Sequence, residues 1–371
     1  MRLTLLPLSR PFLRRSPSAA RAIVPPRRRA RAALLVGLAT FIAAQLGMGV
    51  AVETVKPEWR DPEYGHRIHQ LRELPANHPD RPLVVAVGSS RTLMGLDPLA
   101  MGFADELGSP LVYNFGQTGA GPLQILLTAF RILDDGVKPA ALLIELFPAA
   151  LVGDGSAEDL LQTWQTRFNR GDVARLASYT RNPQSLSRMW LSQRIAPWHS
   201  LRFPLLNHWK ADWLPTSHRL DFQWAGLDSR GWLRYPAESV PAADRARRLA
   251  EAGASYREQL ANYRIGATSD RALRDIASRC RRDGIRAAFY LMPEGPAFAS
   301  WYPPGVFEAF QAYAERLSSE TGVPLFDASK GFSEEEFADS HHLLPGGAAR
   351  FSRKLADECL RGWNAFPSGR N

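Results

Sequence analysis

The sequence of 371 residues predicts an α/β protein: a five-stranded parallel, doubly wound sheet of the flavodoxin-like kind, with a helical insertion and an N-terminal transmembrane helix. Three observations lead to this prediction. Short apolar runs alternate with helical segments on both sides of residues 150–265, which is typical of a parallel sheet. Residues 150–265 themselves contain no clear strand, and residues 32–52 carry no charged side chain.

The basic character of the chain is concentrated at its N-terminus. Residues 1–32 contain nine Arg and no Asp, Glu or Lys, so the net charge of +9 belongs to this segment. The remainder has 37 basic and 37 acidic residues, which argues against nucleic-acid binding.

The apolar run that follows predicts a membrane anchor, since about 20 helical residues span the ~30 Å core of a bilayer. The Arg-rich residues 1–31 are then cytoplasmic and the globular part of the chain lies outside. A cleaved secretion signal, ending near the small residues 49–51, is the alternative.

The next segments are predicted in order along the chain. Residues 53–81 are polar and rich in Pro, which indicates a linker with a short helix over 67–73 and two exposed histidines, His66 and His69. The core domain occupies residues 82–149 and 266–371. Its predicted strands are 83–87, 110–114, 140–146, 285–292 and 323–326. Its predicted helices are 97–107, 122–133, 270–283, 304–321 and 346–363.

The insertion is distinguished by its tryptophans. Seven of the ten fall in residues 150–265: Trp164, Trp190, Trp198, Trp209, Trp213, Trp224 and Trp232. They predict the core of a helical subdomain or, alternatively, a cap over the carboxyl edge of the sheet with rings that stack on sugars or line an acyl pocket. The two cysteines, Cys280 and Cys359, are either a disulfide or two unpaired buried thiols.

Three loops at the carboxyl ends of predicted strands contain the residue types of serine catalysis. They carry Gly88-Ser89-Ser90, the segment from Asn114 to Gly119, and the segment from Asp339 to His342. A serine hydroxyl needs an imidazole to accept its proton, and the imidazole needs a carboxylate to orient it. A lone serine after a strand is also a common helix N-cap, so the serine motif alone leaves both interpretations open.

These motifs resemble the SGNH/GDSL hydrolase superfamily of esterases, lipases, deacetylases and O-acetyltransferases. Gly88-Ser89-Ser90 is similar to the Gly-Asp-Ser block, with Ser in place of Asp, which implies Ser90 as nucleophile. Asn114 and Gly119 match the second block, which implies an oxyanion hole of the Ser90 and Gly119 amides. Asp339 and His342 match the last block and complete the implied triad.

One block departs from the family pattern. The third strand is followed by Glu145-Leu146-Phe147-Pro148 where the family has an Asn. Losing one oxyanion donor typically costs on the order of a hundred- to a thousandfold in rate. Gln117 is a substitute donor in this interpretation, or else an ordinary loop residue. Arg91 and Asn114 are weaker candidates for substrate binding, and a structural ion pair is the alternative for Arg91.

Together these features predict a membrane-anchored serine esterase or O-acetyltransferase, acting on O-acyl, most plausibly O-acetyl, esters of a cell-envelope or exported glycan. The expected partners are that ester substrate and the membrane. No cofactor, metal or nucleic acid is expected, and oligomeric state is left open. The alternatives are a non-catalytic glycan-binding envelope protein and a lipid esterase.

Overall fold

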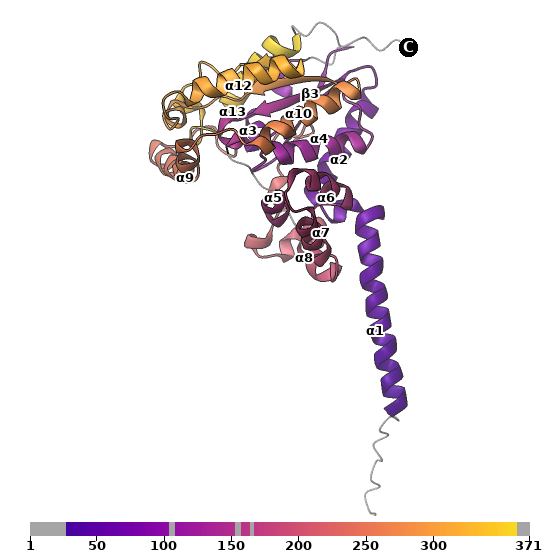
Figure 1. Ribbon diagram of the computed structural model, residues 1–371. Coiled ribbons are helices and arrows are strands. Elements are labelled where there is room, and N and C mark those ends of the chain that lie inside the picture. Colours follow the sequence, from indigo (N-terminus) through magenta and orange to yellow (C-terminus); the bar gives the residue numbers. More distant parts are fainter. Residues whose placement is uncertain (1–26, 104–107, 153–156, 164–166, 362–371) are drawn as a thin grey trace, which may run out of the picture. The chain divides into compact units, whose positions relative to one another are not determined.

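The computed structural model describes residues 27–103, 108–152, 157–163 and 167–361. The chain divides into two compact units, Met1–Gly47 and Met48–Asn371. Figure 1 labels the main elements. The predictions for residues 1–26, for Trp164 and for the ends of the helices at 104–107 and 362–363 fall outside the described residues.

Helix α1 (Arg27–Val50) continues into a π-helical turn, Ala51–Val55. Residues Ala30–Val55 form one helix that is long and apolar enough to span a membrane. This helix coincides with the predicted anchor, whereas its orientation across a membrane stays a prediction.

One sheet of five parallel strands lies at the centre of the second unit, in the order β2-β1-β3-β4-β5. The strands are β1 (Leu83–Gly88), β2 (Leu111–Gly116), β3 (Ala141–Leu146), β4 (Arg286–Leu291) and β5 (Leu325–Phe326). The predicted α/β class and the five parallel strands are therefore confirmed. In the register of β1 and β2, Gly88 lies beside Gly116, so the loops after both strands leave the same edge of the sheet.

Helices cover both faces of this sheet, because alternate strand residues point to opposite sides. Val85 and Phe115 face one core and Val84 and Ala86 face the other. The first core is closed by α2 (Pro62–Asn77), α4 (Pro122–Asp134), α10 (Ala267–Arg282) and α12 (Val306–Thr321). The second is closed by α13 (Pro345–Leu355) and the π-helical turn Ala356–Arg361.

The predicted linker is wrong over much of its length. Residues 62–77 form α2, a four-turn helix whose Ile68 and Leu71 belong to the first core. Arg67, on the same helix, is also fully buried. His66 and His69 are exposed, as expected.

The predicted helix at 97–107 is also wrong within the described residues. The helix after β1 is α3 (Ser90–Gly95), and a single 3-10 turn, Leu99–Met101, follows it. The last helix is regular α-helix only as far as Leu355, before the π-helical turn.

The insertion begins and ends at one place, because Val152 and Ile265 pair in an antiparallel bridge. Its helices are α5 (Ala157–Thr163), α6 (Arg170–Leu176), α7 (Pro183–Ser192), α8 (Pro197–Lys210) and α9 (Ala242–Ala261). Helices α5 to α7 pack on the first core through apolar residues such as Leu161, Val173 and Leu186.

The tryptophans of the insertion do not form one core. Trp198, Trp209 and Trp213 are at least half exposed, so the core interpretation is wrong for these three. Trp232 is buried, and its Nε1 donates to the Met94 carbonyl at 2.7 Å. Of the described elements of the insertion, α9 brings a ring to the candidate site, where Tyr256 lies 5.3 Å from His341 between ring centroids.

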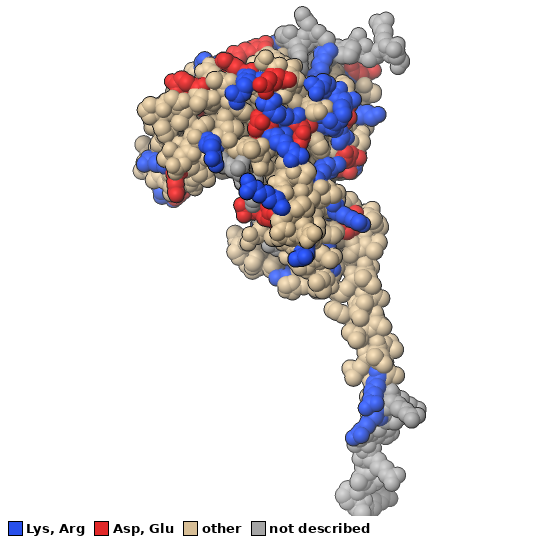
Figure 2. Space-filling model, viewed as in Figure 1, with Lys and Arg blue, Asp and Glu red and all other residues tan. Residues whose placement is uncertain are grey.

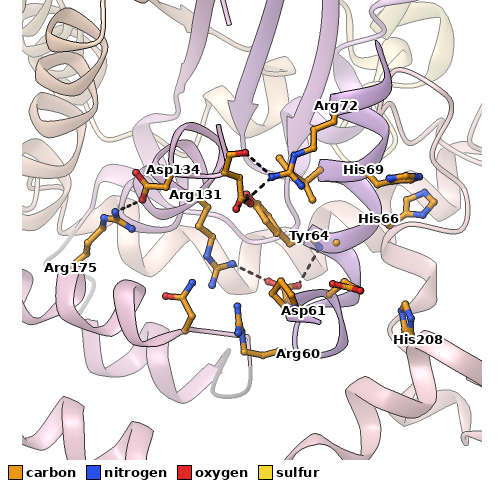
Figure 3. Close-up of a pocket in the computed structure, with 16 residues that line it drawn as sticks. Arg60, Asp61, Tyr64, His66, His69, Arg72, Arg131, Asp134, Arg175 and His208 are labelled. Carbon is orange, nitrogen blue, oxygen red and sulfur yellow. Dashed lines mark hydrogen bonds and ion pairs between the residues drawn. The ribbon is translucent and has the colours of Figure 1, made fainter. Parts of the chain in front are cut away.

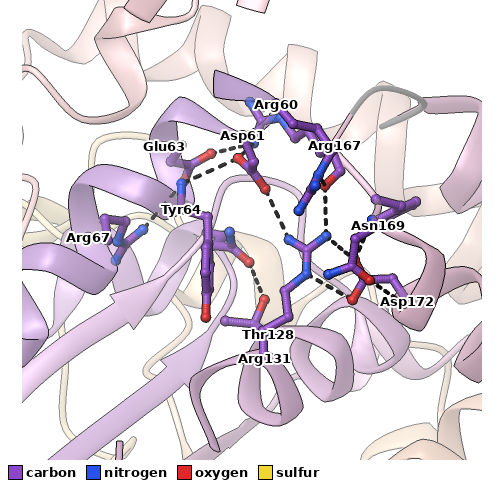
Figure 4. A network of polar contacts seen from close by, with 12 residues as sticks. Arg60, Asp61, Glu63, Tyr64, Arg67, Thr128, Arg131, Arg167, Asn169 and Asp172 are labelled. Carbon is purple, nitrogen blue, oxygen red and sulfur yellow. Dashed lines mark hydrogen bonds and ion pairs between the residues drawn. The ribbon is translucent and has the colours of Figure 1, made fainter. Parts of the chain in front are cut away.

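A buried ionic network ties α2, α4 and the insertion together (Figure 4). Arg131 on α4 pairs with Asp61 at 3.0 Å and with Asp172 at 2.5 Å. Arg167 pairs with Glu63 at 2.6 Å. Breaking a buried pair leaves an uncompensated charge, so this network fixes how the segments after the apolar helix dock on the sheet.

Cys280 and Cys359 are both free and buried. They belong to different cores, on opposite faces of the sheet. The sheet separates the two sulfurs, so the disulfide alternative does not hold in this structure.

Candidate active site

The candidate nucleophile lies on a tight turn at the carboxyl end of β1. Gly88 ends the strand, and a Cβ there would lie 2.1 Å from Thr92 Oγ1 and 2.4 Å from Glu145 Oε2. Only glycine fits this close approach. The turn leads directly into α3, whose first residue is Ser90.

The two serines of this turn have separate roles. Ser89 is the N-cap of α3, since its Oγ accepts a hydrogen bond from the Arg91 amide at 3.1 Å. Ser89 is also buried, whereas Ser90 is partly exposed. The N-cap interpretation therefore belongs to Ser89, and the hydroxyl of Ser90 is available for other contacts.

Ser90 meets the loop between β5 and α13 across the edge of the sheet. Its Oγ lies 2.8 Å from His342 Nε2. On the other side of the ring, His342 Nδ1 lies 2.7 Å from Asp339 Oδ2. The contacts expected from the order serine, Gly-rich loop, Asp-x-x-His are thus present between these three side chains.

The electrostatics of Asp339 determine the direction of these hydrogen bonds. Burial alone would raise its pKa, but the hydrogen bond and charge of His342 outweigh this and hold the pKa well below the usual range. An ionised carboxylate only accepts, so His342 Nδ1 carries the proton and donates to Asp339. When the ring is neutral, His342 Nε2 has the free lone pair and accepts from the hydroxyl of Ser90. This is the arrangement in which an imidazole can act as a base toward serine.

The loop that carries Asp339 and His342 is held rigidly. Ser340 between them is fully buried and has φ +69°, a left-handed conformation that costs a non-glycine residue on the order of 1–3 kcal/mol. Its Oγ accepts from the Phe298 amide at 2.8 Å and donates to Glu334 at 3.0 Å. The Ala338 amide donates to the His342 carbonyl at 2.9 Å. Sequence analysis gave Ser340 no role, and no pattern in the sequence marks it.

The neighbouring His341 does not contact Ser90. It is 6% exposed and packs against the rings of Tyr256, Phe298 and His342. Burial and the adjacent His342 lower its pKa to about 3. His341 is therefore a neutral wall of the site, and His342 is the ring that reaches the serine.

Glu145 is a site residue that sequence analysis treated only as part of the departing third block. Its buried carboxylate accepts from the Ser89 amide at 2.5 Å, from Ser89 Oγ at 3.1 Å and from Thr92 Oγ1 at 2.7 Å. Glu145 thus holds both ends of the turn that presents Ser90. The signal that could have found it is the single charged residue in the apolar run of β3.

Two predicted substrate-binding residues have structural roles instead. Arg91 is 1% exposed; it pairs with Glu294 at 3.3 Å and donates to the Met292 and Pro293 carbonyls. Asn114 is fully buried, and its Nδ2 donates to the carbonyls of Thr92, Leu93 and Leu96 at the end of α3. Because neither side chain has polar atoms open to solvent, these substrate-binding predictions are corrected.

The Gly-rich loop after β2 begins beside the nucleophile turn, because the Gln117 amide donates to the Gly88 carbonyl at 2.9 Å. Gly119 is exposed and has φ +71°, with open space where a Cβ would lie. Gln117 is buried, and its Oε1 accepts from the Thr128 hydroxyl at 2.6 Å. The oxyanion roles of these residues remain predictions.

One group of described residues has the ligand types of a metal site. Atoms of Asp339, His341 and His342 that could bind a metal lie within 4.8 Å of one another. However, His342 Nδ1 and Asp339 Oδ2 already share a hydrogen bond, and His342 Nε2 faces Ser90. An ion held by the atoms that join Asp339 to His342 would displace that hydrogen bond, so the set fits the triad better than a metal.

A cavity of about 460 Å³ lies elsewhere, between α2, α4, α6 and α8 (Figure 3). It is lined by several arginines, but Arg131 pairs with Asp61 and Arg72 with Asp135. Arg175 pairs with Asp134. Because carboxylates neutralise these arginines, we take the serine site, and not this cavity, as the candidate active site.

Comparisons with known proteins do not assign a family. A family model that carries no description matches residues 248–362, less than half of the chain. No curated protein matches the chain. Among solved structures, the crystal structure of TesA is similar, with 14% sequence identity and a TM-score of 0.34, over 74% of this chain and 95% of that chain. A likeness at this level carries no argument about the function.

Proposed function

We propose that this protein is a serine esterase or acyltransferase in which Ser90 is the nucleophile, His342 the general base and Asp339 the residue that orients the base. The observation that carries the proposal is the continuous chain of contacts from Ser90 Oγ through the His342 ring to Asp339, at 2.8 and 2.7 Å. All three side chains are partly exposed, which leaves the serine open to a substrate.

The proposed chemistry follows from these contacts. Ser90 Oγ attacks the ester carbonyl and passes its proton to His342 Nε2, while Asp339 stabilises the imidazolium. The departing alcohol takes that proton, and the acyl group stays on Ser90. Water or a second hydroxyl then attacks, which gives hydrolysis or transfer. The amides of Ser90 and Gly119 are the proposed oxyanion donors.

The test uses the full chain in detergent with p-nitrophenyl acetate and a fluorophosphonate probe. Ser90→Ala should abolish labelling and lower turnover by on the order of a millionfold, because a triad serine is essential. Ser89→Ala is the matched control next to it: it should label more slowly, because Ser89 caps α3, but it should still be labelled at Ser90. Unchanged activity in Ser90→Ala would refute the proposal. A chain that the probe never labels would favour the non-catalytic alternative.

We propose O-acyl esters of an exported or envelope glycan as substrates, with the Arg-rich N-terminus in the cytoplasm and the sheet domain outside. The support is the apolar N-terminal helix preceded by Arg27 and other arginines. An aromatic residue with exposed surface near the site is Tyr256, whose ring lies 5.3 Å from that of His341 between centroids. Tyr256 replaces the insertion tryptophans as the proposed sugar platform.

A lipid ester is the second candidate. It is favoured by the packing of Met48 and Val52, at the end of the apolar helix, against α8 in the same unit as the triad. Comparing acetyl with long-chain esters in the same assay separates the two classes, because a lipid esterase should prefer the long chains.

A further inference from the structure

The corner between α7 and α8 presents large apolar side chains to solvent. Leu191 is 58% exposed, Ile195 78% and Trp198 53%. All three lie within eight consecutive residues. Figure 2 shows that the lobe formed by α5 to α8 is mostly uncharged on the face drawn, with a few charged side chains, whereas charged side chains are denser on the right-hand part of the sheet domain. Clustered exposed apolar residues mark an interaction surface.

This corner packs directly against the end of the apolar helix. A Cβ added to Gly49 would lie 3.6 Å from the ring of Pro197, at the start of α8. Val52 is fully buried against Leu201 and Leu205 of α8. The contacts continue to the far end of α8, where Trp209 meets Trp59 at 5.3 Å between ring centroids.

An ion pair fixes the same junction. Arg194, between α7 and α8, contacts Glu53 at 2.9 Å. Glu53 is the first charged residue after the apolar stretch and marks where the chain leaves an apolar environment. The corner is therefore attached to the helix at the level of its last apolar turns.

The depth of that level follows from helix geometry. From Ala32, the first residue after Arg31, to Val52, the last before Glu53, the rise is about 30 Å at 1.5 Å per residue. This matches the ~30 Å thickness of the hydrocarbon core, so the last turn, from Gly49 to Val52, lies at the interface with the headgroups. Trp is enriched at that interface, and apolar side chains gain free energy by entering it.

We propose that the α7–α8 corner, formed by Leu191, Ile195 and Trp198, inserts into the interface of the membrane that the N-terminal helix spans. The proposal rests on the membrane location given under the proposed function. The occupant is the lipid bilayer, because the covalent helix brings the corner to it. Arg188, exposed on the same corner, is placed to meet lipid phosphates. The corner is then a second contact that fixes how the sheet domain stands on the membrane.

The test uses the full chain with single cysteines at Ile195→Cys and Trp198→Cys. The native Cys280 and Cys359 are buried, so a maleimide carrying an NBD fluorophore labels the new positions. The labelled chain is reconstituted into phosphatidylcholine and phosphatidylglycerol vesicles that contain lipid with a doxyl group near the headgroup. Both labels should lose most of their emission, since the quencher acts only at short range.

Trp213→Cys is the matched control, because Trp213 is 73% exposed but lies beyond the far end of α8. Its label should keep its emission. Labels at Ile195 and Trp198 that are quenched no more than the control would refute the inserted corner. Emission shifted to the blue without lipid quenching would mean that a protein covers the corner, which also refutes it. A chain that fails to float with the vesicles would refute the membrane span itself, and esterase activity in detergent would be untouched by either result.

Discussion

Glu145 gives the sharpest test of how the nucleophile is positioned. In Glu145→Ala, the Ser89 amide, the Ser89 hydroxyl and the Thr92 hydroxyl all lose their acceptor. Each buried donor left without a partner costs roughly 1–3 kcal/mol. The Thr92 hydroxyl keeps its contact with Tyr290 at 2.6 Å, and a water that fills the space would soften the remaining loss. We therefore expect a destabilisation of about 3 kcal/mol.

The same change should affect Ser90 more than the rest of the fold. Ser89 both caps α3 and binds Glu145, so releasing it lets the first turn of α3 move. A displacement of the reacting atom by about 1 Å can cost on the order of a hundredfold in rate. We expect a loss of that size in the rate at which a fluorophosphonate labels Ser90.

Glu145→Gln is the matched control. With its oxygen at the Oε2 position it still accepts from the Ser89 amide and from Thr92, and its NH₂ group can donate to Ser89 Oγ. Only the Ser89 hydroxyl proton then lacks its acceptor, against three donors in Glu145→Ala, so stability and labelling should stay closer to wild type than in Glu145→Ala. The readouts are the thermal unfolding midpoint and the labelling rate. Wild-type labelling by Glu145→Ala, or equal losses in the two variants, would contradict the positioning role.

Three further predictions concern the same site. His341 has a pKa of about 3 in the fold and about 6.5 when unfolded, so between these values only the unfolded chain binds the proton. The free energy of unfolding should therefore fall by up to about 1.4 kcal/mol per pH unit as the pH drops from 6.5 towards 3. Thermal unfolding measured against pH should lose this slope in His341→Phe, and an unchanged slope would contradict the assignment. Ser340→Ala and Ser340→Gly both lose the two hydrogen bonds of the hydroxyl, but only glycine relieves the left-handed strain, so Ser340→Ala should destabilise more than Ser340→Gly, by about 1 kcal/mol or more in thermal unfolding; the reverse order would contradict strain at this position. Gly88→Ala should slow labelling of Ser90 on the order of a hundredfold, whereas Gly346→Ala, which has open space at its Cβ position, should not change it; equal labelling rates in the two variants would contradict the close packing at Gly88.

The sheet is predictable from the sequence because its strands are buried on both faces. Such strands are continuous apolar runs, and their ends are marked by glycine and proline, as at Pro82 and Gly88 of β1. The three loops at the carboxyl ends follow from the same pattern. This is why residues as distant as Ser90 and His342 can be placed at one edge without a structure.

Helix α2 could not be predicted in this way. Its buried side includes Glu63 and Arg67, which a hydropathy pattern assigns to solvent. They are buried because partners from other segments neutralise them: Arg167 of the insertion pairs with Glu63, and the carbonyls of Asn114 and Gly116 accept from Arg67. Burial that depends on a distant ion pair leaves no periodic apolar signal in the local sequence.

Helix α3 was missed for a related reason. Six residues are too few to form a helix alone, and tertiary contacts sustain this one. Ser89 caps its start, and Asn114 of β2 binds the carbonyls at its end. The role of Asn114 was misjudged, since a polar residue beside a candidate nucleophile is typical of substrate binding until its partners are known. For Arg91 the structural ion pair, which the sequence left open, is the interpretation that holds.

The strand order explains why the loop with Asp339 and His342 must be so rigid. Ser90 follows β1 and His342 follows β5, and β3 and β4 lie between them, a width of about 14 Å at ~4.8 Å per strand. The loop therefore crosses the ends of two strands before it reaches the serine. A loop of this length would adopt many conformations without tertiary contacts. The bridge of Phe337 with Leu343 and the burial of Ser340 hold it in one conformation.

The second set of fixed points comes from the helices that follow each half of the site. Helix α13 starts three residues after His342, and its Ser352 Oγ accepts from the Asp97 amide at 2.7 Å, just beyond α3. A Cβ on Gly95 of α3 would lie 3.3 Å from Leu343. Because α3 begins with Ser90 and Leu343 adjoins His342, the packing of α3 against α13 sets the distance between the proposed nucleophile and the proposed base. Substitutions at this helix contact should therefore change the rate at Ser90 without touching any of the three catalytic candidates.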